Sequence, residues 1–189
     1  MIKSNNIISR DMLVMLRECK GKKIEYLLRA EFGKKTSFEV VILRFKECDL
    51  EIWSLEQPDK EGGLSDLAKI IVKKNPAKDS LAPIGNESDD GTFQHDEFAR
   101  TSINQTIIGI TVHNELVKSY DKNGTVDFLL ANTYAIVISL GTRYLHIVKD
   151  IYWSEIWEIS FSQSPVPKAP EWGECEGDMY IATHSVIEL

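Results

Sequence analysis

Residues 134–148 indicate the fold most clearly, and they read Tyr-Ala-Ile-Val-Ile-Ser-Leu-Gly-Thr-Arg-Tyr-Leu-His-Ile-Val. β-Branched and aromatic residues dominate both ends of this stretch, and such residues favour strands. Gly141 and Thr142 stand between the two ends, and glycine gives the backbone the freedom that a tight turn needs. The stretch therefore predicts two strands, 134–140 and 144–148, joined as an antiparallel hairpin.

A similar pattern occurs nearer the N-terminus. Phe38-Glu-Val-Val-Ile42 aligns with Tyr134-Ala-Ile-Val-Ile138 at an offset of 96 residues, and Leu50-Glu-Ile52 aligns with Leu145-His-Ile147 at an offset of 95. One interpretation is a duplicated strand–hairpin unit. The alternative is that any two antiparallel hairpins share an apolar–turn–apolar pattern.

Outside these hairpins the patterning predicts two short helices and several more strands. Ser9 is placed to cap a helix in which apolar residues repeat at spacings of three and four from Met12 to Cys19, and Gly21 would end it. Apolar residues spaced three and four apart predict a second helix over Leu64–Val72, ended by Asn75-Pro76. Asn123-Gly124 is typical of a hairpin turn. The expected class is α+β, mainly antiparallel β-sheet with a few short helices. The other expected strands lie near residues 24–28, 38–45, 50–54, 105–113, 126–130, 157–161, 179–181 and 186–189.

Composition shifts divide the chain into two halves. Residues 79–99 contain no Lys or Arg, several carboxylates and turn-forming Pro and Gly, which is typical of a solvated linker. We therefore expect an N-terminal helix-plus-hairpin half over residues 1–78, an acidic linker over 79–99 and a strand-rich acidic half over 100–189. The alternative is one compact domain.

Charge narrows the range of partners. The 189 residues include 22 Lys and Arg and 29 Asp and Glu, for a net charge of −7, and the excess of acid lies in residues 86–189. Such a half would repel phosphates, so nucleic acid is not an expected partner. It would attract a basic protein, although acidic surfaces also simply keep many proteins dispersed.

The sequence favours a cytoplasmic protein without a metal or cofactor. No apolar run approaches the roughly 20 residues of a membrane helix, and Ile7-Ile8 is too short for the apolar region of a signal peptide. The three cysteines are widely spaced, as reduced thiols usually are. Zinc-type ligand spacing, a phosphate-binding glycine loop and the Gly-x-Ser-x-Gly motif are all absent from the sequence.

The main hypothesis is a non-catalytic protein-binding module of the inhibitor or immunity type. Trp172 stands in a segment rich in Pro and Glu that does not resemble core, and tryptophan is a common interface anchor. Trp157, by contrast, is expected in the core. A basic protein partner would contact Trp172 and the acidic residues Glu155, Glu158, Glu171, Glu174, Glu176 and Asp178.

Two alternatives remain open at this point. One is a small hydrolase-like enzyme with His146 or His113 as base and Asp150 or Glu155 as its carboxylate partner. The other is a subunit of a homo-oligomer in which exposed strand edges pair. The sequence does not decide the oligomeric state.

Overall fold

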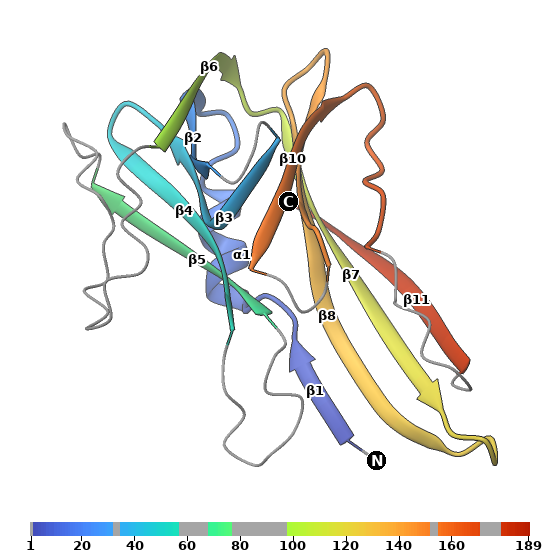
Figure 1. The fold of residues 1–189 in the computed structure, drawn as a ribbon. Coiled ribbons are helices and arrows are strands. Elements are labelled where there is room, and N and C mark those ends of the chain that lie inside the picture. The colour runs from blue at the N-terminus through green and yellow to red at the C-terminus, as the bar shows by residue number, and fades with distance from the viewer. Residues whose placement is uncertain (1, 32–34, 57–67, 77–97, 152–154, 171–178) are drawn as a thin grey trace, which may run out of the picture.

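The computed structural model describes residues 2–31, 35–56, 68–76, 98–151, 155–170 and 179–189. In these residues strands dominate, and they form one 11-stranded sheet accompanied by one short helix (Figure 1). The expectation of a mainly antiparallel β-sheet is confirmed. Of the two expected helices one forms, so the described part of the chain is mainly β. None of its helices is long and apolar enough to cross a membrane.

The helix α1 (Arg10–Arg17) begins where the sequence predicted. The Ser9 hydroxyl accepts a hydrogen bond from the Met12 backbone nitrogen at 3.3 Å, which satisfies one of the free N–H groups at the start of the helix. Leu16 and Cys19 are buried, so the apolar side of the helix faces the core. Gly21 follows with φ 81°, in the left-handed region that glycine adopts without strain.

The N-terminal strands pair in the order β5-β4-β3-β2-β6. Four of them pair in chain order, and the fifth, β6, returns to pair with the free side of β2. All of these pairings are antiparallel. The strands are β2 (Lys23–Glu31), β3 (Thr36–Arg44), β4 (Cys48–Glu56), β5 (Ala68–Pro76) and β6 (Phe98–Thr106).

The helix predicted over Leu64–Val72 is wrong, because its described part belongs to strand β5. Ala68, Ile70 and Val72 are buried at every second position, which is the period of a strand. β5 also pairs with β4 along its whole length. A short apolar run fits both a helix and a strand, and here the neighbouring strand decides between them.

The C-terminal strands pair in the order β10-β9-β8-β7-β11, and β1 pairs in parallel with β8. The predicted turn at Asn123-Gly124 is confirmed, with Gly124 at φ 78°. Residues 126–130 and 134–140, expected as two strands, lie largely in the single strand β8, and the last expected strands form the single strand β11. The strands are β1 (Ile2–Asn6), β7 (Gly109–Tyr120), β8 (Val126–Ser139), β9 (Tyr144–Lys149), β10 (Ile156–Ser162) and β11 (Met179–Glu188).

One hydrophobic core joins the two sets of strands. It contains residues such as Leu43 from β3 and Ile136 from β8, and Met12 of α1 packs against it. Trp157 is fully buried there, as predicted. β3 also pairs with β10, where Phe38 lies opposite Ile156, so hydrogen bonding continues from one set to the other. The division at residues 79–99 stays a prediction, since most of that segment lies outside the described residues.

The two sets share one strand order: four strands pair in chain order and the fifth pairs with the first. Their central turns also agree, because Phe45 donates its backbone N–H to Cys48 and Leu140 to Arg143, both at 2.9 Å. An offset of 95 residues relates β3 to β8 and β4 to β9 around these turns. The offset of 96 expected from the sequence for β3 is therefore one residue too large. At 95, the buried residues Val41, Leu43, Leu50 and Ile52 correspond to the buried residues Ile136, Ile138, Leu145 and Ile147.

Candidate functional site

Three of the four histidines gather on the outer face of the C-terminal sheet, opposite the main core. They are His113 on β7, His146 on β9 and His184 on β11. The Tyr134 ring lies between two of them, with its centroid 6.0 Å from the rings of both His113 and His184. The structure therefore brings together the two histidines singled out by the sequence and adds a third.

His113 is nearly inaccessible to solvent, and its ring contacts a side chain of its own strand, β7. Its Nε2 lies 3.1 Å from the hydroxyl oxygen of Thr111, two residues earlier on the same face. Burial, reinforced by the nearby His146 and His184, lowers the pKa of His113 below its usual value. The ring is therefore neutral at physiological pH.

His146 is also buried, and its contact is with the segment that follows β10. Its Nε2 lies 2.8 Å from the main-chain oxygen of Ser164. That segment covers part of the outer face, since Pro167 and Pro170 are buried and Ala169 packs against the apolar cluster around Tyr134. The contact between His146 and Ser164 therefore helps to hold the proline-rich segment against the sheet, which is a structural role.

The carboxylate nearest to this group is Glu115, which the sequence did not single out. Its Oε1 lies 3.5 Å from Nε2 of His184, and Glu115 itself is only 3% exposed. The pair depends on β11 lying beside β7 with His184 opposite Glu115. No local pattern in the sequence specifies that register.

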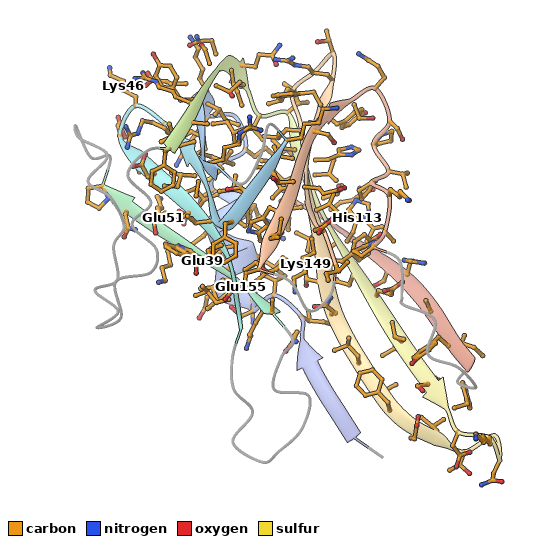
Figure 2. All side chains as sticks on the ribbon, viewed as in Figure 1. Glu39, Lys46, Glu51, His113, Lys149 and Glu155 are labelled. Atoms are coloured by element: carbon orange, nitrogen blue, oxygen red, sulfur yellow. The ribbon has the colours of Figure 1, made fainter. Side chains whose placement is uncertain are left out.

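The carboxylates proposed for the enzyme lie far from the histidines along their strands. Asp150 is four residues beyond His146, or roughly 13 Å along an extended chain. Glu155 precedes β10, and its main-chain oxygen accepts a hydrogen bond from the Glu39 backbone at 3.0 Å on the far side, at β3 (Figure 2). The contacts of the two histidines found in the described residues are with the Thr111 hydroxyl and the main-chain oxygen of Ser164.

The predicted partner-binding residues fall mostly outside the described part of the chain. Glu158 is exposed on β10, as expected, and Glu155 is half-buried at its start. The predicted residues that lie outside them are Glu171, Trp172, Glu174, Glu176 and Asp178.

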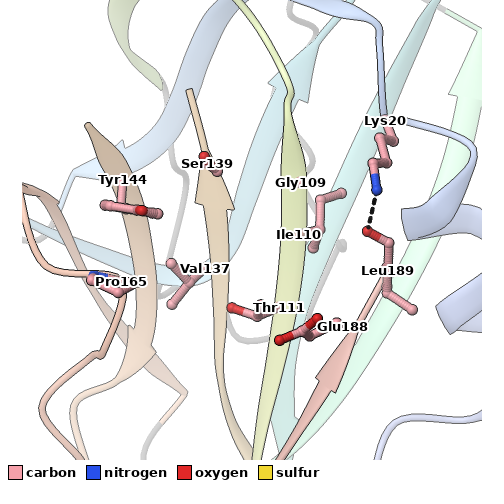
Figure 3. Close-up of a pocket in the computed structure, with 10 residues that line it drawn as sticks. All are labelled: Lys20, Gly109, Ile110, Thr111, Val137, Ser139, Tyr144, Pro165, Glu188 and Leu189. Atoms are coloured by element: carbon pink, nitrogen blue, oxygen red, sulfur yellow. Dashed lines mark hydrogen bonds between the residues drawn. The ribbon is translucent and has the colours of Figure 1, made fainter. Parts of the chain in front are cut away.

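A cavity of about 420 Å³ lies beside the histidines on the same outer face (Figure 3). Thr111, Val137 and Ser139 of β7 and β8 form its middle, and residues from neighbouring segments form two opposite sides. Neither His113 nor His146 is among the residues that line the cavity. Thr111 does line it, and the Thr111 hydroxyl contacts the His113 ring. One side carries Tyr144 and Pro165, and the other carries Lys20, Glu188 and Leu189.

In the part of the chain that the structure describes, strand β11 is an edge of the sheet, and it pairs with β7 over ten consecutive positions without a bulge. Residues 181–186 are all exposed, including the apolar side chains of Ile181 and Val186. From residue 179 to 187 there is no Lys, Arg, Asp, Glu, Gly or Pro. This edge is long, regular and uncharged, which are the properties that favour pairing with another strand.

A buried lysine stands on the inner side of the same sheet (Figure 2). The Lys149 ammonium donates to the main-chain oxygen of Ala68 and, at 3.4 Å, to Oδ1 of Asn132. Burial lowers the pKa of Lys149 to about 7. The side-chain nitrogen of Asn132 is buried without a partner. Lys149 is not among the residues that line the cavity described above.

The described residues contain no group of three His, Cys, Asp or Glu side chains able to hold a metal ion. The chain matches no protein-family model, no curated protein and no solved structure.

Proposed function

We propose that this protein is a non-catalytic protein-binding module, which captures a basic protein partner at the free edge of its C-terminal sheet. The observation that carries the proposal is β11, the ten-residue edge strand, in which residues 179–187 contain no Lys, Arg, Asp or Glu and residues 181–186 are exposed. An extended segment of a partner can add a strand to such an edge, with main-chain hydrogen bonds providing affinity.

The other long strands with one free side support this choice by contrast. β5 carries Lys69, Lys73 and Lys74 and ends at Pro76, and such residues discourage strand pairing. β6 carries Asn104 in the left-handed region at φ 51°, beside a shift in its register with β2. Among the described strands, β11 combines length and regularity with the absence of these protecting features.

Charge favours a basic partner. Asp178 is bonded directly to Met179, the first residue of β11, and Glu171, Glu174 and Glu176 stand just before it in the sequence. Four carboxylates therefore stand within eight residues before the start of β11, where a partner strand would pair. Complementary charge increases the rate of encounter and selects the partner.

The test is retention of proteins from a lysate of the source organism by the tagged full chain, at low and high salt. We expect one basic protein to be retained in stoichiometric amount at low salt and released by high salt. A bait carrying Ile181→Glu and Val186→Glu should lose it. The added negative charge alone would strengthen attraction to a basic protein, so a loss reports on strand contact.

The matched control is Val14→Glu, an exposed apolar residue on α1, which does not pair with β11. The control bait should retain the same partner as the unmodified chain. Equal retention by the β11 double variant would refute the edge as the docking site. If nothing is retained at either salt concentration, the binding function itself is wrong.

We also propose that the two five-strand sets arose by duplication of one unit. The supporting observations are their common strand order, the matching central turns and the buried residues related by 95 positions. Superposition of the two sets in a crystal structure should reproduce that offset across both central strands. A different offset would contradict the proposal.

A further inference from the structure

The cavity on the outer face has a chemical character that the edge strand does not explain. We propose that it binds a guanidinium group, that of an arginine side chain on the basic partner. For the source of the arginine, this inference rests on the proposed function. The preference of the cavity for a guanidinium follows from its own lining residues.

The cavity is large enough for the guanidinium and stem of an arginine side chain. Its volume of about 420 Å³ is within the range of sites for small groups. Tyr144 and Pro165 form one side, and the buried Val137 lies in the middle (Figure 3). Gly109 also lines it, and a side chain built at Gly109 would meet nothing within 4 Å. The missing side chain at this position therefore keeps the space open.

The polar groups of the cavity are mainly acceptors without partners. The Glu188 carboxylate and the hydroxyls of Ser139 and Tyr144 make no hydrogen bond or ion pair with any described residue, although all three line the cavity. A carboxylate only accepts hydrogen bonds, and hydroxyls can accept as well as donate. A positively charged ligand rich in donors would pair with the Glu188 carboxylate.

A guanidinium meets these requirements better than an ammonium. It is planar and carries five N–H donors in a fixed geometry, so it can donate two parallel hydrogen bonds to the Glu188 carboxylate. A paired carboxylate–guanidinium contact is among the stronger hydrogen-bonded interactions in proteins. The apolar stem of an arginine would pass over Val137 and Pro165.

One lining residue opposes such a ligand. The Lys20 ammonium stands at the edge of the cavity, where it donates to the main-chain oxygen of Leu189 at 3.1 Å. Its charge repels a second cation nearby. Removal of this charge should therefore strengthen binding of a guanidinium, an effect opposite to that expected if Lys20 simply supported the shape of the cavity.

The first experiment is an NMR titration of the full chain with N-acetyl-arginine amide, with N-acetyl-citrulline amide as its neutral counterpart of nearly equal shape. We expect saturable shifts of the backbone amides of Gly109, Ser139 and Tyr144 with the arginine probe. The citrulline probe should bind at least about tenfold more weakly, because it lacks the charge that pairs with Glu188.

Variants then assign the contact. Glu188→Gln should weaken arginine binding about 10- to 100-fold, since it removes the charged acceptor. Gly109→Val should abolish binding by filling the space, and Lys20→Met should strengthen it. Glu158→Gln, which removes an exposed carboxylate on β10 outside the cavity lining, is the matched control and should leave binding unchanged.

The second experiment separates the cavity from the edge strand. Excess arginine probe should displace the partner captured by the unmodified chain. Failure of the arginine probe to bind, or equal binding of the citrulline probe, would overturn the inference and leave capture at β11 intact. If the arginine probe binds but does not displace the captured partner, the arginine does not come from that partner and the inference is wrong.

Discussion

Replacement of Lys149 by methionine should change how the stability of this protein depends on pH. The lysine is buried between the two sets of strands. Its ammonium has two acceptors, the main-chain oxygen of Ala68 and the side chain of Asn132. Burial without a counter-charge disfavours its ammonium form and lowers its pKa from 10.5 to about 7. Methionine has a similar length and no charge.

The magnitude follows from proton linkage. Each unit of pKa shift corresponds to about 1.4 kcal/mol, so the buried ammonium costs the folded state about 5 kcal/mol below pH 7. Between about pH 7 and pH 10.5 the unfolded chain binds this proton and the folded chain releases it. Stability therefore rises with pH across that window. From pH 7 to pH 9 the contribution of Lys149 to the free energy of unfolding should increase by about 2 kcal/mol.

The assay is urea unfolding of the unmodified chain and of Lys149→Met at pH 6, 7, 8 and 9. The difference in unfolding free energy between them should change with pH as calculated. Its absolute value is less informative, because methionine leaves the oxygens of Ala68 and Asn132 without a donor at a cost of about 1–3 kcal/mol each. Lys118→Met, at an exposed position on β7, is the control and should show no such change. Parallel stability curves for Lys149→Met and the unmodified chain would refute the reasoning.

Three further predictions concern the rest of the fold. Asp49→Asn should lower the free energy of unfolding by about 1–3 kcal/mol in urea titrations at pH 7, because it removes the charge from a partly buried pair in which Arg44 donates to both carboxylate oxygens at 2.8 and 2.7 Å. Gly124→Ala should cost about 1–2 kcal/mol in thermal or urea unfolding, since its φ is 78°, whereas Gly109→Ala should cost less because its side chain enters open space. Cys19 should stay unlabelled by thiol reagents at pH 8, as judged by peptide mass mapping, because burial raises its pKa to about 11; labelling as fast as in urea would contradict this.

Much of the local structure is predictable because its causes are local. Ser9 can cap α1 with the backbone of a residue three positions away, and Gly124 and Gly141 adopt positive φ angles within their own turns. Strand β3 follows from its β-branched residues in the same way. In each case the residues that decide the conformation are within a few positions of it.

The errors arose where a distant neighbour decides. Ala68–Val72 has an apolar spacing compatible with either a helix or a strand, and its pairing with β4 makes it a strand. Residues 126–139 form one strand rather than two because β7 pairs along nearly all of it.

The sequence by itself determined the strand-rich class, the position of the first helix, the hairpin turns and the burial of Trp157, since these follow from local preference and alternation. Only the tertiary structure placed β11 at an edge of the described sheet and brought Glu115 beside His184. It also formed the cavity beside Tyr144 and buried Lys149. Each of these depends on which strands become neighbours and in which register. Pairing between residues far apart in the chain is set by the packing of the whole core, and no short segment contains that information.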